Sequence, residues 1–425
     1  MIRFLLKGIL NDKSRSVLPI IVVSIGVALT VLLNCWLNGV MGESIVMNAN
    51  FSTGHVKVVT RAYAEESEQM PNDLAILGVD SLVQQIKSTF PALDWVKRIR
   101  FGGLIDFPDE NGETRAQGPV VGWAIDLLSQ GSKEPARFNI HESLVSGNSP
   151  RKRGEALISY DLAEKFGVKP GDEFTLFGTT MDGAMAFKNF TVSGTVRFGS
   201  TVLDRGAVIV DIMDAQQALG MEDAAGEVLG YFSNEQYDNA KATSIANSFN
   251  ASHNVHQTDE FAPTMLRLTD QGGMAEYLEY SSKMSGIMVF VFVLAMSVVL
   301  WNAGLLGGLR RYKEFGVRLA LGEEKTHLYT TLIYEGILIG AIGSITGTAL
   351  GLGISYYLQV VGIDISSSMQ NSSLMMPSVV RAAITPTAFY IGFVPGLFSM
   401  VLGNALSGIG IYKRKTAQLF KELEV

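Results

Sequence analysis

The chain has 425 residues, of which 47% are hydrophobic and 18% charged, and its formal net charge is −7 at pH 7. It is too long for one ordinary domain and too apolar for an ordinary soluble protein. A net-negative chain without a basic patch interleaved with aromatic residues gives no support for nucleic-acid binding. The single cysteine, Cys35, excludes an intramolecular disulfide.

Four apolar segments are long enough to cross a bilayer, which requires roughly 20 residues. They are residues 17–40, 284–309, 328–358 and 387–412. The first lacks the short apolar core and small-residue cleavage site of a signal peptide, so we expect it to be retained. The four predicted spans separate five further segments, which are residues 1–16, 41–283, 310–327, 359–386 and 413–425.

Charge predicts the orientation of these segments. Residues 41–283 hold 33 acidic and 20 basic side chains, while the remainder holds 8 acidic and 14 basic. The basic residues gather before the first span, between spans two and three, and after span four, whereas Arg381 is the only basic residue of 359–386. Because basic loops stay inside, we expect both termini and residues 310–327 to be cytoplasmic. Residues 41–283 and 359–386 are then outside.

Strand and helix patterns alternate in the outer domain. Strands are predicted at 55–60, 95–101, 189–198 and 206–210, a hairpin at 104–123, a strand–helix–turn–strand series from Glu155, and helices at 80–90 and 237–249. This mixture predicts an α+β domain with two subdomains and an insertion near residues 100–150. Residues 260–283 are predicted to extend the second span outward as a stalk helix.

Patterns typical of enzymes and metal sites are missing from the sequence. There is no Gly-Lys dipeptide for a phosphate-binding loop, no G-x-S-x-G and no H-E-x-x-H. His253 and His256 have no third ligand nearby, and Asp109, Glu110 and Glu113 lack the twelve-residue calcium pattern. We therefore expect a non-catalytic chain that binds no metal or cofactor of its own.

The third span contains one acidic residue, Glu335. A carboxylate within a span is costly, so it faces a partner or water. Two interpretations stay open: Glu335 pairs with a loop arginine near the inner face, or it relays motion from the cytoplasmic loop.

Glycines recur along the same span at spacings of four, three, four and four, which places them on one helical face: Gly336, Gly340, Gly343, Gly347 and Gly351. Small residues let helices approach closely in lipid. The face predicts close packing, either against another span of this chain or at a subunit interface. In span four, Pro395-Gly396 predicts a kink.

Residues 311–325 read RYKEFGVRLALGEEK and connect spans two and three. A helix this short is not stable alone, so its apolar side chains require a protein partner or the lipid surface. The pattern Arg311-x-x-Glu314-Phe315-Gly316-Val317-Arg318-x-Ala320-x-Gly322 resembles the cytoplasmic coupling segment of FtsX/MacB-like ABC permeases. Glu335-Gly336 and the glycine-rich span that follows are similar too, as is the order of one span, a large outer domain and three spans.

Within that group, residues 54–58 and 154–176 are most similar to the lipoprotein-releasing, LolC/LolE-type branch. The chain departs from the family at Glu323, where a small residue is common. The resemblance implies an α-helical membrane protein with four transmembrane helices. A large periplasmic α+β domain, the MacB-like periplasmic core, would be inserted between helices 1 and 2. The chain would be a multi-pass protein of the bacterial inner membrane.

The resemblance also implies partners. A cytoplasmic ABC ATPase dimer, which binds ATP and Mg²⁺, would contact the coupling residues Arg311, Glu314, Phe315, Gly316, Val317, Arg318, Leu321 and Gly322. Four spans supply one permease half, so a second permease subunit is expected, either the same chain or a paralogue. A periplasmic carrier would be a further partner.

The implied function is extraction or release of lipid-anchored cargo from the outer leaflet. Cargo would enter a cavity lined by the apolar residues Ile25, Leu29, Leu32, Trp36, Val289, Phe292 and Met296. A second interpretation is that these residues only contact lipid or pack the spans together. The alternative function is a mechanotransmitting permease that acts on periplasmic peptides, drugs or a cell-wall regulatory partner.

Overall fold

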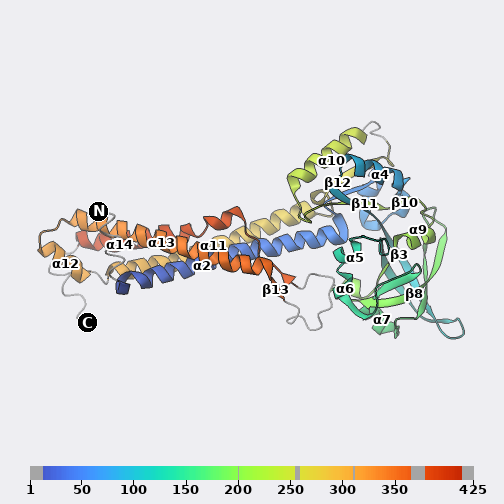
Figure 1. Cartoon of the computed structure of the whole chain (residues 1–425), viewed down its shortest axis with the longest axis horizontal. Helices are drawn as coiled ribbons and strands as arrows, with labels where there is room; N and C mark the ends of the chain where they lie inside the picture. Colours follow the sequence, from blue (N-terminus) through green and yellow to red (C-terminus); the bar gives the residue numbers. More distant parts are fainter. Residues whose placement is uncertain (1–12, 200, 254–258, 310–311, 365–378, 414–425) are drawn as a thin grey trace. The chain divides into compact units, whose positions relative to one another are not determined.

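The computed structural model describes residues 13–199, 201–253, 259–309, 312–364 and 379–413 (Figure 1). The chain divides into a helical unit and a mixed unit. The helical unit comprises Met1–Gly42, Tyr280–Ile363 and Val380–Val425, and the mixed unit comprises Glu43–Glu279 and Asp364–Val379.

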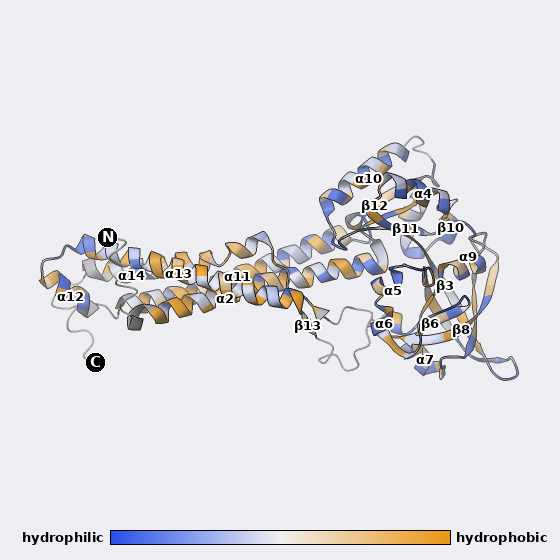
Figure 2. Cartoon of the chain, in the orientation of Figure 1, coloured by the Kyte–Doolittle hydropathy of each residue, from blue (hydrophilic) through white to orange (hydrophobic). Residues whose placement is uncertain are grey.

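The helical unit is built from long apolar helices, which Figure 2 colours as hydrophobic over much of their length. Helices α2 (Lys13–Asn48), α11 (Met274–Leu309) and α13 (Lys325–Val360) each contain 36 residues. With the segment Pro386–Ile409 they make four helices long and apolar enough to cross a membrane. The structure thus confirms four apolar helices and extends the first three beyond the predicted spans.

The fourth apolar segment is irregular. A 3-10 turn, η6 (Pro386–Phe389), and a π-turn, η7 (Val394–Phe398), precede helix α14 (Ser399–Lys413). The π-turn contains Pro395, which has no amide hydrogen and so cannot continue an ordinary helical hydrogen-bond ladder. The break lies where the sequence predicts a kink.

A ten-stranded mixed sheet forms the centre of the mixed unit. Its order is β12-β1-β11-β3-β4-β9-β6-β8-β5, and β7 pairs with β3 and β8. The strands are β1 (Val56–Thr60), β3 (Leu93–Pro108), β4 (Thr114–Ile125), β5 (Leu144–Gly147), β6 (Glu155–Ser159), β7 (Glu173–Thr179), β8 (Met185–Val196), β9 (Ala207–Asp211), β11 (Glu227–Phe232) and β12 (Pro263–Arg267).

Helices and turns accompany this sheet. They are η1 (Ala49–Thr53), α3 (Arg61–Glu65), η2 (Ser67–Gln69), η3 (Asn72–Leu74), α4 (Val79–Thr89), α5 (Glu134–Arg137), α6 (Ile140–Ser143), α7 (Tyr160–Phe166), α8 (Thr201–Asp204), α9 (Ile212–Leu219), α10 (Asn239–His253) and η4 (Leu268–Asp270). Two short pairs complete the fold: β2 (Ile76–Leu77) with β10 (Ala224–Ala225), and β13 (Ile363–Asp364) with β14 (Val379–Val380).

The two-unit division of the chain does not test the predicted two subdomains, which stay a prediction. Strand β3 is long: it pairs with β11 through its first part and with β4 and β7 through its second. One strand therefore joins both halves of the sheet. The predicted hairpin is present as β3 and β4, and Asp109 closes its turn by accepting from the backbone N–H groups of Asn111 and Glu113.

The predicted stalk helix at 260–283 is wrong in its first half. Residues 263–267 form β12, which pairs with β1, and α11 begins only at Met274. Gly272 and Gly273 have φ values of +49° and +66°. This left-handed backbone favours glycine and interrupts a helix, so the helical pattern cannot extend further back.

Alternate residues of the strands pack on opposite faces of the sheet. In β6, Ala156 and Ile158 join one hydrophobic cluster, while Leu157 joins another with Trp123 and Phe198. This is the period-two alternation of a strand whose faces are both buried. The second, smaller cluster includes the ring of Phe51 from η1.

Candidate functional site

The predicted coupling segment forms a short helix, α12 (Tyr312–Ala320). Among the α12 side chains whose burial the structure describes, Phe315 is the one buried apolar side chain; it is 4% exposed and packs against Leu328 and Leu332 of α13. The predicted role of Phe315 in contacting an ATPase stays a prediction, and in the isolated chain its side chain is covered by α13. Within the described residues this side chain attaches α12 to the following helix.

A Schellman motif ends α12. The N–H of Glu323 donates to the carbonyl of Arg318 at 3.1 Å, and the N–H of Gly322 donates to Leu319 at 3.2 Å. Gly322 has φ of +93°, which explains why the motif has glycine there. The chain then turns directly into α13, where His327 Nδ1 lies 2.8 Å from Glu323 Oε1.

Two apolar side chains of this segment are exposed: Val317 of α12, which is 47% exposed, and Leu321, directly after α12, which is 83% exposed. Beside them, Arg318 donates to Glu314 at 2.6 Å across one helical turn. Gly316 is buried, and Arg311 lies outside the described residues. The segment is thus fixed on one side and offers an apolar edge flanked by an ion pair on the other.

The glycine face of α13 is buried against other helices of the same chain. A Cβ placed on Gly343 would lie 2.6 Å from Val23, one on Gly347 2.5 Å from the carbonyl oxygen of Ser24, and one on Gly351 2.9 Å from that of Ala28. These three glycines therefore let α13 approach α2 closely. The contacts are those of intramolecular packing.

The remaining two glycines of this face meet the fourth apolar segment. A Cβ on Gly336 would lie 2.5 Å from the amide of Asn404, and one on Gly340 would lie 3.1 Å from the Cα of Leu397. Glu335, next to the first of them, is half-buried in α13.

The predicted cargo residues divide into two groups. Ile25 and Leu29 of α2 are 55% and 45% exposed, whereas Leu32 and Trp36 are half-buried. On α11, Val289, Phe292 and Met296 are half-buried. A Cβ on Gly26 would lie 2.7 Å from the Met296 methyl carbon, so Met296 packs on α2.

Helix α11 leaves an extensive apolar surface uncovered. Only 6% of its most apolar stretch is buried, against 39% in each of the other three segments. Exposed side chains occur all around it, including Phe290, Val291, Leu294 and Val298. Such a helix is stable in lipid or against another helix, but not in water.

In the mixed unit, a cluster of buried charges lies directly after α2. Arg98 donates through Nε to Glu134 at 2.6 Å, and through Nη1 to the carbonyl of Asn50 in η1 at 2.6 Å. Tyr231, which accepts from Arg98 at 3.0 Å, donates to the carbonyl of Ala49 at 3.0 Å. Two carbonyls of η1, directly after the C-terminal end of α2, thus bind a buried cation and a phenol.

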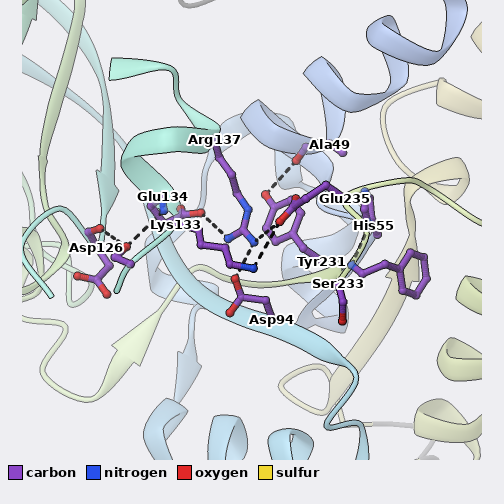
Figure 3. Close-up of polar contacts among 12 residues, drawn as sticks. Ala49, His55, Asp94, Asp126, Lys133, Glu134, Arg137, Tyr231, Ser233 and Glu235 are labelled. Atoms are coloured by element: carbon purple, nitrogen blue, oxygen red, sulfur yellow. Dashed lines mark hydrogen bonds and ion pairs between the residues drawn. The ribbon is translucent and has the colours of Figure 1, made fainter. Parts of the chain in front are cut away.

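A second arginine completes this cluster (Figure 3). Arg137 donates to Glu134 at 3.2 Å, to Asp94 at 2.6 Å and to Glu235 at 3.2 Å. Its guanidinium carbon lies 3.8 Å from the ring centre of Tyr231. Sequence reasoning missed the cluster. The period-two pattern of the predicted strand places Arg98 with Arg100, opposite Ile99 and Phe101, so no signal in the sequence indicated that Arg98 is buried.

His55 lies at the edge of the same cluster. The backbone N–H of Phe232 donates to His55 Nδ1 at 2.9 Å, which requires that nitrogen to be unprotonated. Burial, together with the charge of Arg137, lowers the pKa of His55 to about 4. Burial has the opposite effect on an acid, and it raises the pKa of the Tyr231 hydroxyl. The structure therefore holds a neutral histidine beside charged groups.

No group of three or more His, Cys, Asp or Glu side chains that could hold a metal occurs among the described residues. His253 stacks on Phe249, with ring centres 4.1 Å apart, and His256 lies outside the described residues. Asp109 Oδ1 accepts from the backbone N–H groups of Asn111 and Glu113 within the hairpin turn.

Taken with the four apolar helices, the sheet-rich domain that follows α2 in sequence defines a multi-pass membrane protein of the permease type. Residues 16–243 match the model of the MacB-like periplasmic core domain, and residues 286–416 match that of the FtsX-like permease C-terminal region. The chain therefore belongs to the MacB-like, FtsX-like family of ABC transporter permeases, which are inner-membrane proteins.

Curated relatives are distant. The chain is 22% identical to the lipoprotein-releasing system transmembrane protein LolC of Haemophilus influenzae, over 65% of this chain and 67% of that protein. It is 28% identical to the macrolide export ATP-binding/permease protein MacB of Hyphomonas neptunium, over 19% of this chain. The chain spans only 13% and 15% of the lengths of two such MacB relatives.

Among solved structures, the crystal structure of the periplasmic region of MacB from Actinobacillus actinomycetemcomitans matches 53% of this chain and 94% of that chain, with 7% identity and a TM-score of 0.35.

Proposed function

We propose that this chain is a permease subunit that couples ATP hydrolysis by a separate cytoplasmic ATPase to the extraction or release of lipid-anchored cargo. In this proposal both termini and α12 are cytoplasmic, and the mixed unit is periplasmic. The permease works with a second permease subunit, which is another copy or a paralogue. ATP and Mg²⁺ are bound by the ATPase.

The observation that supports coupling is the surface of α12. Phe315 is buried against α13 while Leu321 and Val317 are exposed. A push on the exposed edge is therefore transmitted through packed side chains to a long apolar helix. Since α13 packs through its glycines against α2, displacement of α12 would reach both helices.

The exposed apolar faces of α2 and α11 support a lipid-anchored cargo. Acyl chains gain little by leaving the bilayer for another apolar surface, because lipid tails are as apolar as leucine. The permease must instead form a cavity with its partner subunit and close it again. The extent of the LolC alignment, about two thirds of both chains, favours this cargo class.

A second candidate function is MacB-type mechanotransmission, in which the permease acts on periplasmic peptides, drugs or a cell-wall regulatory partner. The match to the MacB-like core domain and the higher local identity to MacB, 28% against 22%, favour it. Both functions use a cytoplasmic ATPase, so association with an ATPase does not separate them.

The test is an inventory of what co-purifies with the full chain and its ATPase, by mass spectrometry, without nucleotide and in an ATP-trapped state. We expect acylated proteins in the first state and their loss in the second. Native mass spectrometry should find two permease chains and two ATPases. Recovery of soluble peptides or a cell-wall hydrolase, without acylated proteins, would favour the second function. One permease chain per two ATPases would contradict the proposed assembly.

A further inference from the structure

A cavity of about 330 Å³ lies in the mixed unit, where η1 meets the sheet. Its walls include Phe51 of η1, Trp123 of β4, and Phe198 and Leu203 from the segment after β8. The ring of Phe51 is tilted against that of Phe138, with ring centres 4.9 Å apart, and the ring centres of Trp123 and Phe198 are 5.9 Å apart. The volume is at the small end of the range for small-molecule sites, which suits a ligand with one acyl chain rather than two.

Two hydrogen-bond donors at this wall lack an acceptor. Arg100 and Trp123 are directly opposite each other in the β3–β4 register, so their side chains share one face. Among the described residues, the buried Arg100 Nε and Trp123 Nε1 have no hydrogen-bond partner. A buried donor without an acceptor is unfavourable in free energy. The Arg100 side chain as a whole is half-buried, although its Nε atom is buried. An oxyanion bound here would therefore meet two N–H groups, Arg100 Nε and Trp123 Nε1, that have no acceptor among the described residues.

The backbone at the cavity is also unusual. Phe51 and Ser52 belong to the π-turn η1, in which the N–H of Gly54 donates to Ala49 at 2.9 Å. π-turns are rare and are frequently found at functional sites. Here the turn places Phe51 and Ser52 at the cavity wall, and the buried Arg98 binds the carbonyl of Asn50 between its two ends.

We propose that this cavity binds a single-chain amphiphile with an anionic head group. The acyl chain lies among Met47, Phe51, Phe198 and Leu203, and the oxyanion accepts hydrogen bonds from Arg100 and Trp123. This site is separate from any cavity between membrane-spanning helices. It does not depend on the cargo class proposed above, so either proposal can fail without the other.

The test uses fluorescence quenching of tryptophan by a dibrominated fatty acid, with the full chain in nanodiscs of unbrominated lipid. The chain has four tryptophans. Replacing Trp36 and Trp301 of the apolar helices with Phe leaves Trp95 and Trp123. Trp95 packs in the cluster on the other face of the sheet. We expect saturable quenching that disappears in a further Trp123→Phe variant, and much weaker quenching by the methyl ester of the same acid.

The head-group contact is tested by Arg100→Gln, with Arg151→Gln as the matched control because Arg151 is exposed and lies elsewhere in the unit. Loss of a charge-assisted hydrogen bond should weaken binding of the acid by roughly tenfold or more in Arg100→Gln only. Ser52→Phe, which fills the cavity, should abolish saturable quenching. Nanodiscs made with brominated phosphatidylglycerol, without added acid, test a two-chain bilayer phospholipid, and quenching of Trp123 in them would overturn the single-chain occupant.

Equal quenching by acid and methyl ester would overturn the proposed head-group contact, and this comparison needs no substitution in the cavity. Quenching that persists in the Trp123→Phe variant would place the acid elsewhere. No saturable quenching of Trp123 by the acid would overturn the site itself. None of these outcomes bears on whether lipid-anchored cargo co-purifies with the ATPase complex.

Discussion

Arg98 binds both carboxylate oxygens of Glu134, with Nε–Oε2 at 2.6 Å and Nη2–Oε1 at 3.0 Å, and both side chains are almost completely buried. The same guanidinium reaches the carbonyl of Asn50. A bidentate pair of this kind fixes direction as well as distance. It therefore determines where the turn after α2 attaches to β3.

Glu134→Gln should loosen this attachment, because it leaves a buried guanidinium without its counter-charge. Removing one partner of a buried pair costs about 3–5 kcal/mol. In the full-length protein we expect the backbone amides of η1 and β11 to exchange hydrogen faster, by the factor that corresponds to this loss of free energy. The control is Lys97→Gln, which breaks a solvent-exposed pair with Asp80 and should cost at most about 1 kcal/mol. Equal exchange in the two variants would contradict the role of the buried pair.

The buried, neutral His55 predicts a pH dependence. The pKa of His55 is about 4 in the folded protein, against 6.5 ordinarily. Between these values the unfolded chain binds a proton that the folded chain does not, so stability is full above about pH 6.5 and falls as the pH drops toward 4. The shift corresponds to roughly 3 kcal/mol. Hydrogen exchange of the β11 amides between pH 7.5 and 4 measures it, after correction for intrinsic exchange rates.

His55→Asn isolates this contribution, since an asparagine oxygen can still accept from the N–H of Phe232 and does not titrate. We expect this variant to lose most of the dependence between pH 6.5 and 4. His253→Asn, in α10 and away from the charge cluster, should keep it. The same slope in both variants would assign the pH dependence to other groups.

The exposed apolar edge beside α12 predicts that coupling to the ATPase can be impaired without an effect on folding. Leu321→Asp should weaken association with the ATPase or uncouple hydrolysis from transport, while folding is unaffected because the side chain is 83% exposed. Burying a leucine is worth roughly 1.5–3 kcal/mol, so affinity should fall by about 10- to 150-fold. Leu77→Asp, an exposed leucine of β2, is the matched control. Unchanged ATPase binding and transport in Leu321→Asp would remove α12 as the coupling element.

Orientation is tested with single cysteines in a Cys35→Ala background. A cysteine at Asp182, in the exposed loop between β7 and β8, should react with an impermeant thiol reagent in intact spheroplasts. One at Glu323, after α12, should react only once the membrane is permeabilised. Labelling of Glu323→Cys in intact spheroplasts would reverse the proposed topology.

Sequence reasoning was most successful where one physical requirement dominates. An uncharged segment of more than 20 residues has few alternatives to a long buried or membrane-embedded helix. Gly322 and the turn at Asp109 follow from backbone requirements that few residues satisfy. The β3–β4 hairpin is local in sequence, so its two strands could be paired from the turn alone.

Features that depend on distant residues could not be predicted. Phe315 and Leu321 are both apolar residues of one short segment, and only the position of Leu328 determines which one is buried. Arg98 and Glu134 are 36 residues apart, and Lys57 pairs with Glu227 across 170 residues. The helical pattern of residues 260–273 was overridden by pairing of β12 with β1.

The cargo proposal predicts crosslinks from one face of α2. A photocrosslinker at Leu29, which is exposed and on the face opposite the buried Val27 and Val31, should capture an acylated protein in the nucleotide-free state. The crosslink should disappear in the ATP-trapped state, because closure of the cavity expels the cargo. Ile345 of α13, also exposed, is the control and should crosslink to phospholipid alone. If Leu29 and Ile345 both captured only phospholipid, unchanged by nucleotide, the apolar face of α2 would be an ordinary lipid contact. The MacB-type alternative would then be the better account of this permease.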